Sequence, residues 1–154
     1  MKPGRREPYL IEERTLVVDE AALERLKQGP RILGVGLLIW RGESLLLIRE
    51  DKEGRRDRWL MVGGALEPGE PPEQAARREA LEEVGLRLSE LRLAKLVRLR
   101  FRAGRRRVTK HFLIYEAKVP EGARIRRGSG VLEARWFKTL PRPLLFPEDF
   151  KGLI

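Results

Sequence analysis

The segment from Gly64 to Leu86, GALEPGEPPEQAARREALEEVGL, constrains the fold of this chain more than any other stretch. Pro71 and Pro72 suit the first turn of a helix, where the missing N–H of proline would have had no partner. Gly85 suits the left-handed position just past a last helical turn. The segment therefore predicts a glycine-containing loop followed by a short helix that ends before Gly85.

The predicted helix has an apolar face and an acidic face. At about 100° per residue, the apolar arc contains Ala76, Ala80, Leu81 and Val84, and the acidic arc contains Glu79, Glu82 and Glu83. Neighbouring carboxylates repel one another unless a cation lies between them, and oxygen ligands favour Mg²⁺ or Mn²⁺. Arg78 can reach Glu82 one turn along the helix, and Glu70 in the loop is a second candidate partner for Arg78. We therefore expect a divalent-metal site on the acidic face.

The whole segment also has a distinctive spacing of glycine and charged residues. The spaced residues are Gly64, Glu70, Arg78, Glu79, Glu82, Glu83 and Gly85. This spacing resembles the signature box of the Nudix (MutT-type) hydrolases without a gap, with Ala80 and Leu86 at the two apolar positions. Family members often carry Pro-Gly-Gly before the box, where this chain has Val62-Gly63-Gly64, so we expect a slightly altered entry to the loop.

The resemblance implies a role for each residue of the box. The metal-binding and catalytic positions fall on Glu79, Glu82 and Glu83, and the backbone carbonyl of Gly64 is similar to a further metal ligand. Glu70 and Arg78 resemble the structural ion pair that joins the loop to the helix. The implied activity is that of a Mg²⁺- or Mn²⁺-dependent Nudix hydrolase that cleaves the diphosphate linkage of a nucleoside diphosphate joined to another group, X.

The chemistry of a diphosphate linkage is consistent with this set of groups. The linkage is anionic and resists attack by water, so a catalyst must neutralise its oxygens, position a water and help the leaving phosphate depart. Metal ions held by the three glutamates would meet the first two needs. A free carboxylate would act as the general base, and the candidates are Glu79, Glu82, Glu116, Glu121 and Glu133.

The rest of the chain predicts one mixed domain with an N-terminal extension. The 154 residues, of which 42% are hydrophobic, can form one domain with a proper core. Residues 1–30 form the extension, with a strand at 15–18 and a helix at 20–27 that Asp19 caps. Residues 31–154 form the Nudix hydrolase domain, for which the resemblance implies an α/β/α sandwich around a mixed β-sheet. The extension fits a packing element, a homodimer contact or a lid over the substrate.

Strand patterns account for most of residues 31–154. Apolar runs or alternation predict strands at 32–40, 45–48, 59–62, 91–101, 108–119 and 131–137. The polar loop at 49–58 is rich in arginine, and Arg49 and Arg58 are candidates for binding substrate phosphates, with a solvated loop as the alternative. Glu133 lies in a segment similar to one that often follows the box in Nudix proteins, and is a further candidate for substrate binding.

The charge and the apolar runs limit the partners of the chain. The net charge is +10, and the absence of cysteine excludes disulfides, thiol nucleophiles and cysteine-based zinc sites. The predicted 91–119 hairpin gathers Arg98, Arg100 and Arg102 on one face, which suits a polyphosphate or the 5′ end of an RNA, or a solvated face that discourages edge pairing. The longest apolar run is far too short to span a bilayer, so we expect a cytoplasmic protein without a membrane partner.

Two functions remain as alternatives at this stage. The first is hydrolysis of a nucleotide-type small molecule, such as a dinucleoside polyphosphate or a nucleoside triphosphate, or of an RNA 5′ end. The second is a Nudix-fold module that binds nucleic acid or regulates without hydrolysis. Such modules usually lack acids of the box, and all of them are present here. The sequence favours the hydrolase and leaves its substrate open.

Overall fold

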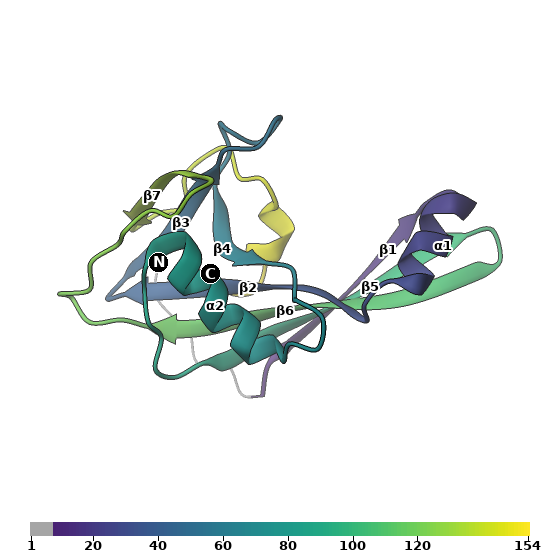
Figure 1. Ribbon diagram of the computed structural model, residues 1–154, viewed down its shortest axis with the longest axis horizontal. Coiled ribbons are helices and arrows are strands. Elements are labelled where there is room, and N and C mark those ends of the chain that lie inside the picture. Colours follow the sequence, from purple (N-terminus) through teal and green to yellow (C-terminus); the bar gives the residue numbers. More distant parts are fainter. Residues whose placement is uncertain (1–7) are drawn as a thin grey trace.

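The chain folds around a seven-stranded mixed β-sheet with two α-helices (Figure 1). The computed structural model describes residues 8–154. The elements are β1 (Leu10–Val17), α1 (Glu20–Gln28), β2 (Ile32–Arg41), β3 (Ser44–Glu50), β4 (Leu60–Gly64), α2 (Pro72–Val84), β5 (Arg92–Ala103), β6 (Arg106–Lys118), β7 (Val131–Phe137) and the 3₁₀-helix η1 (Pro147–Phe150). Each strand predicted for residues 31–154 is present, and the predicted α/β class with a mixed β-sheet is confirmed.

The strand order is β1-β5-β6-β2-β4-β3-β7, which places β2 at the centre. β2 runs parallel to β6 and antiparallel to β4, so the sheet is mixed. Residues 35–40 of β2 are all buried, as expected for a continuous apolar run that is covered on both faces. β4 ends at Gly64 beside β2, and this pairing positions the glycine loop that precedes α2.

Different parts of the chain cover the two faces of the sheet. On one face, α2 buries Ala75, Ala76, Ala80 and Val84 against side chains of β2, β3 and β6. On the other face, Phe150 and Leu153 of the C-terminal segment pack in a second cluster with Leu38 and Trp40. The second covering layer is therefore the C-terminal segment with η1, because α1 lies at the far end of β5 and β6 (Figure 1).

One side chain of α2 is placed differently from the expectation. The sequence pattern puts Leu81 on the apolar arc, and that prediction is wrong because its side chain is 43% exposed. The buried arc is centred on alanines, whose small side chains let the helix approach the sheet closely, and it includes Ala75 in place of Leu81.

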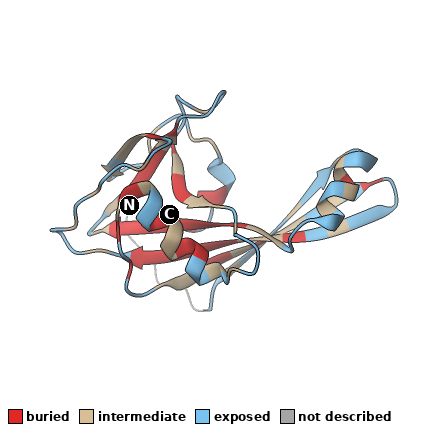
Figure 2. Cartoon of the chain, viewed as in Figure 1, coloured by how far each residue is buried: buried red, intermediate tan, exposed pale blue. Residues whose placement is uncertain are grey.

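The N-terminal extension forms an arm with the end of the β5–β6 hairpin. The arm consists of α1, the C-terminal end of β1 and the hairpin turn at 104–105, and it projects from the body of the sheet (Figure 1). Figure 2 shows that its surface is mostly exposed or intermediate, whereas the buried residues gather in the body. Asp19 caps α1 as predicted, because its carboxylate accepts a hydrogen bond from Ala22 N at 2.7 Å. The first seven residues of the predicted extension lie outside the described part.

Acidic side chains of the extension pair with three arginines of the basic hairpin. Glu13 on β1 accepts hydrogen bonds from Arg98 and Arg100, at 2.7 Å and 3.0 Å. Arg106 on β6 donates to both Glu20 and Glu24 of α1.

β1 begins five residues earlier than predicted, because it pairs with β5 along its whole length, from Leu10 opposite Lys95 to Val17 opposite Arg102. Within residues 8–154, no helix combines the length and apolar character needed to cross a membrane.

Candidate active site

The glycine loop brings the backbone of β4 directly under α2. Gly63 pairs with Gly36 and Gly64 with Val35 across the β2–β4 ladder. A Cβ atom on Gly63 would lie 2.1 Å from the carbonyl oxygen of Val35, and its φ of 157° lies in a region that side chains rarely adopt. Only glycine therefore fits this position. The loop then leads to α2, which begins at Pro72 and is followed by Gly85 in the left-handed conformation.

Two carboxylates of α2 converge on this loop. Glu83 accepts a hydrogen bond from the backbone N–H of Gly63 at 2.9 Å. Glu79, one turn earlier, lies over Gly64, because a Cβ atom there would be 2.6 Å from Glu79 Oε1. Their i,i+4 spacing places both groups on one side of the helix. The space that a side chain on Gly64 would take is thus filled by a carboxylate.

The positive charge near the two carboxylates does not offset the effect of their burial. Burial raises the pKa of Glu83 to about 8, and the charges of Glu79 and Glu50 add to this effect. Burial also raises the pKa of Glu79, and the hydrogen bond from Arg78 opposes that rise only in part. Such a pair is stabilised by a cation between its members. The donor set of carboxylate and backbone oxygens, next to a loop that leaves no room for a side chain, fits Mg²⁺ or Mn²⁺.

Arg78 organises the remaining charges of the box. Its Nε donates to Glu70 Oε2 at 2.8 Å and its Nη2 to Glu70 Oε1 at 3.0 Å. Its Nη1 donates to Glu79 Oε1 at 2.9 Å, and Nη2 also reaches the carbonyl of Ala65 at 3.0 Å. The Glu70 carboxylate has a lowered pKa chiefly because of the hydrogen bonds from Arg78. The Glu70–Arg78 pair therefore joins the loop to the helix and orients Glu79.

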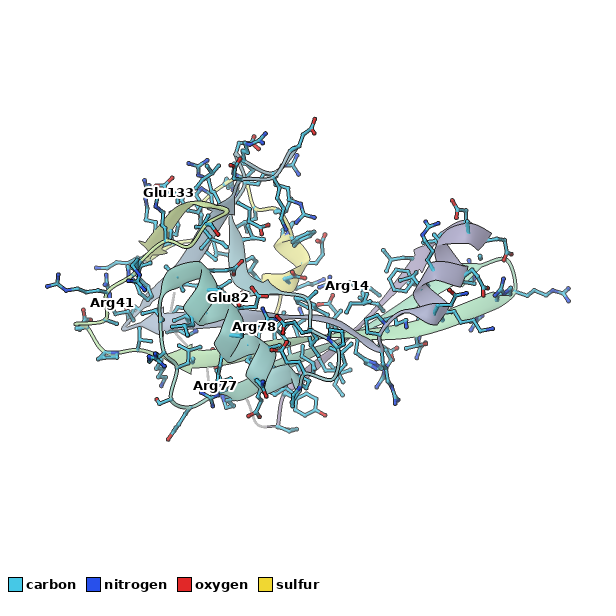
Figure 3. The ribbon with its side chains drawn as sticks, in the orientation of Figure 1. Arg14, Arg41, Arg77, Arg78, Glu82 and Glu133 are labelled. Atoms are coloured by element: carbon cyan, nitrogen blue, oxygen red, sulfur yellow. The ribbon has the colours of Figure 1, made fainter. Side chains whose placement is uncertain are left out.

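Glu82 lies apart from the other two box glutamates. It pairs with Arg78 Nη1 at 3.1 Å, and its side chain is 58% exposed (Figure 3). Across residues 8–154, no three His, Cys, Asp or Glu side chains lie close enough together to hold a metal ion. The structure thus brings Glu79 and Glu83 together at the glycine loop and leaves Glu82 at the rim, so bound water would complete the ligand set of a cation held there.

A pocket of about 570 Å³ opens beside the loop. Its lining includes Gly63 and Gly64, and it also includes Glu50, Lys52 and Arg55 at the end of β3 and in the loop after it. Lys52 and Arg55 both lie 3.4 Å from Glu50 oxygens, so two cations flank a buried carboxylate at the pocket edge. This volume is typical of sites for small molecules.

The candidates for substrate binding, and Glu116 and Glu133 among the candidates for the general base, are not part of this pocket. Arg49, Arg58 and Glu133 are not among the residues that line this pocket. Arg49 donates to Glu133 at 2.9 Å between β3 and β7, and Glu133 lies away from Arg78 and Glu82 (Figure 3). Glu116 is buried and accepts from the indole N–H of Trp40 at 3.0 Å. These two carboxylates therefore have structural partners.

Glu50 is the site residue that the sequence analysis missed. Its carboxylate is buried at the pocket, and its charge contributes to the raised pKa of Glu83. The alternation of side chains along β3 could have indicated Glu50. Leu46 and Ile48 face α2, and the same two-residue period places residue 50 on that face.

Comparison with known proteins concerns the family and the fold of the chain. A family model described as the NUDIX domain matches residues 30–140. The chain belongs to the Nudix family. The match covers the sheet from β2 to β7, the glycine loop and α2, and it leaves out β1, α1 and the C-terminal segment with η1.

Individual Nudix relatives resemble parts or most of the chain. An RNA pyrophosphohydrolase of Brucella ovis is 34% identical over 58 residues, which cover 38% of this chain and 33% of that protein. The chain thus spans about a third of the length of the curated relatives that it matches. A MutT NUDIX hydrolase from Burkholderia pseudomallei has a TM-score of 0.60 at 25% identity, over 80% of this chain and 95% of that one. A C. elegans Ap4A hydrolase binary complex has a TM-score of 0.53 at 23% identity, over 68% and 78%.

Proposed function

We propose that this protein is a Nudix pyrophosphohydrolase that cleaves the diphosphate linkage of a nucleotide-type substrate with the help of Mg²⁺ or Mn²⁺. The observation that carries the proposal is the convergence of Glu79 and Glu83 on the Gly63–Gly64 backbone, where both carboxylates have raised pKa values. A bound divalent cation would neutralise phosphate oxygens and polarise a water for attack.

The residues of the chain have distinct roles in this proposal. Glu79 and Glu83 hold the cation, with the backbone carbonyl of Gly64 as a further ligand, and Arg78 keeps Glu79 in place through its hydrogen bond. Lys52 and Arg55 line the pocket next to the glycine loop, where they can bind the phosphate groups of the substrate. The attacking water needs a general base, and Glu50 joins Glu79 and Glu82 as a candidate because it lines the pocket.

A substrate panel tests the proposal directly. The panel contains nucleoside triphosphates, dinucleoside polyphosphates, ADP-ribose and 5′-triphosphorylated RNA, each with Mg²⁺, Mn²⁺ or EDTA. The names of the relatives, an RNA pyrophosphohydrolase and an Ap4A hydrolase, place two of these classes among the first to assay. We expect metal-dependent release of phosphate, pyrophosphate or nucleotide from at least one class.

Glu83→Gln separates the proposed site from a contaminating activity. We expect this variant to lose at least about 100-fold in kcat, because it removes one of the two cation-binding carboxylates. Glu90→Gln makes the same change at an exposed carboxylate that does not line the pocket, and it should retain full activity. Full metal-dependent turnover by Glu83→Gln would refute the proposed site.

The alternative of a nucleic-acid-binding module has less support. Two arginines of its basic hairpin face, Arg98 and Arg100, already pair with Glu13 of the extension. Silence of the whole substrate panel, together with tight RNA binding that weakens steeply with salt, would favour this alternative.

A further inference from the structure

The last residue of β3 carries a carboxylate that lies outside the Nudix box. Glu50 is buried at the edge of the pocket, and its charge contributes to the raised pKa of Glu83. Its backbone lies in the β3–β7 ladder, opposite Val131. The next residue, Asp51, donates its backbone N–H to the carbonyl of Gly130 at 2.9 Å. The carboxylate is therefore attached to a fixed strand, next to a residue whose backbone is also bound.

Each oxygen of this carboxylate holds one cation of the loop that follows. Lys52 Nζ lies 3.4 Å from Glu50 Oε2, and Arg55 Nη1 lies 3.4 Å from Glu50 Oε1. The Lys52 side chain is 62% exposed and the Glu50 side chain is 11% exposed, so the carboxylate is the buried member of the cluster. Lysine and arginine side chains have many rotamers, and a fixed partner limits where their charges lie.

The backbone of the loop brings both cations to one carboxylate. Arg55 N donates to the carbonyl of Lys52 at 3.0 Å, and Arg58 N donates to the carbonyl of Arg55 at 3.0 Å, so the chain turns tightly here. Asp51 and Arg56 close the same loop with an ion pair at 2.6 Å. Lys52 and Arg55 can therefore reach Glu50 together although three positions separate them in the sequence.

The C-terminal segment adds a second contact to Arg55. The guanidinium carbon of Arg55 lies 5.5 Å from the centre of the Phe146 ring, which is a cation–π distance. Arg55 and Phe146 both line the pocket, whereas Arg56 and Arg58 of the same loop are not among its lining residues. Arg55 is thus held at the pocket wall from two segments that are distant in the sequence.

Both cations keep donors for a further partner. A lysine ammonium has three N–H donors and an arginine guanidinium has five. Arg55 uses Nη1 for its hydrogen bond to Glu50, and Lys52 approaches Glu50 through one ion pair. Phosphate oxygens are the acceptors that both side-chain types bind well. Cations that are already oriented lose less side-chain freedom when such a ligand binds.

We propose that Glu50 is a positioning residue that presents Lys52 and Arg55 to the phosphate groups of the substrate. This inference rests on the proposed function, because it requires phosphates at this edge of the pocket. It also separates two roles that Glu50 could have. A positioning residue acts on substrate binding through the two cations, whereas a general base acts on the chemical step.

The first test measures phosphate binding without turnover. The probe is imidodiphosphate, in which a P–N–P bridge replaces the hydrolysable P–O–P bridge, titrated calorimetrically with Mg²⁺ into the full chain. Glu50→Gln should weaken binding about tenfold, the size of a hydrogen bond to a charged group. Glu53→Gln makes the same change at an exposed acid of the same loop that does not line the pocket, and it should bind as wild type. Unchanged binding by Glu50→Gln would overturn the inference.

A double-mutant cycle then shows whether Glu50 acts through the cations. The variant with both Lys52→Met and Arg55→Met lacks the two charges that Glu50 holds. Adding Glu50→Gln to this variant should cause no further loss of imidodiphosphate binding, because the group through which Glu50 acts is already absent. An equal loss with and without the cations would show that Glu50 acts independently of them, which refutes a positioning role.

Kinetics and metal binding exclude the other roles of an acid at this place. With the best substrate of the panel, Glu50→Gln should raise KM about tenfold and keep kcat within about threefold of wild type. A fall in kcat of about 100-fold or more at unchanged KM would assign Glu50 as the general base instead. A loss of Mn²⁺ affinity as large as in Glu83→Gln, measured by electron paramagnetic resonance, would assign it as a metal ligand. Either result overturns the inference.

The binding assay also keeps this inference distinct from the proposed function. If no substrate is cleaved but imidodiphosphate binding depends on Glu50 through the two cations, the proposed hydrolysis fails and the inference stands. If a substrate is cleaved and Glu50→Gln changes neither KM nor imidodiphosphate binding, the hydrolysis stands and the inference fails. Should Glu50→Gln fail to fold, Glu50→Asp keeps the charge but withdraws it by one carbon–carbon bond. It should weaken imidodiphosphate binding in the wild-type background and not in the variant without the cations.

Discussion

Replacing Gly64 by alanine would move one carboxylate of the site without changing its chemistry. The added Cβ atom would lie 2.6 Å from Glu79 Oε1 and 2.7 Å from Cδ. To reach an ordinary contact of about 3.4 Å, the Glu79 carboxylate must move by roughly 0.8 Å. A displacement of about 1 Å at a catalytic site can cost about 100-fold in rate, which corresponds to roughly 2.7 kcal/mol of activation free energy.

The same substitution should have little effect on folding. The described backbone does not place Gly64 at a positive φ, and the atoms that the new methyl group meets are at the flexible end of a side chain. We therefore expect a change in the free energy of unfolding within about 1 kcal/mol, measured by urea denaturation. Activity is measured as steady-state hydrolysis of the best substrate of the panel over a range of Mg²⁺ concentrations.

A matched glycine provides the control for this experiment. At Gly122, no atom lies within 4 Å of the position that a Cβ atom would take, and the backbone has no positive φ. Gly122→Ala should therefore retain wild-type kcat and stability. If Gly64→Ala also retained wild-type kcat and the same requirement for Mg²⁺, Glu79 would not act at the site, and the reasoning from the Gly64 contact would be refuted.

Three further predictions concern individual contacts. The pKa of Glu83 is raised from 4.5 to about 8, so between these pH values the metal-free folded state keeps a proton on Glu83 that the unfolded state has lost. The free energy of unfolding should therefore fall by roughly 5 kcal/mol as the pH rises from about 4.5 to about 8. Urea denaturation in EDTA should show this fall in wild type and much less of it in Glu83→Gln, and Mg²⁺ should restore stability at high pH. Arg78→Met should lower kcat at least about tenfold and reduce the melting temperature, because it leaves Glu70 and Glu79 without their shared partner. The control Arg77→Met, on the same helix, should keep the wild-type kcat. Leu153→Ala should lower the free energy of unfolding by about 2–5 kcal/mol, because Leu153 is fully buried under the sheet. Leu81→Ala, at a half-exposed position, should change it by less than about 1 kcal/mol. Equal costs for the two leucine variants would contradict the assignment of the C-terminal segment as a core layer.

Local sequence signals were sufficient for the elements around the site. The helix α2 begins at the proline pair and ends before Gly85, as expected, because both signals act through backbone geometry within one turn. The spacing of Glu79 and Glu83 placed them on one side of the helix for the same reason. The continuous apolar run at 32–40 predicted a strand covered on both faces, and β2 is that strand.

The structure decided the relations between segments that are distant in the sequence. Glu50 reaches the site only because β3 and β4 pair beside α2, and no local pattern states that pairing. Leu81 is exposed because the sheet meets α2 on its alanines, although its residue type favours burial. Local periodicity describes a face of an element, whereas burial depends on which other element covers that face.

The pocket contains features that the sequence alone determined and contacts that only the tertiary structure decided. The sequence by itself determined the glycine loop, the acidic helix and, through their spacing, the family. Only the tertiary structure joined Arg14 from the first strand with Asp149 near the C-terminus, 135 positions apart. The physical reason is that hydrogen-bonding geometry along one helix or turn is encoded by neighbouring residues. A contact between β1 and the C-terminal segment exists only after the sheet has formed, since the sheet holds both segments at one end of the pocket.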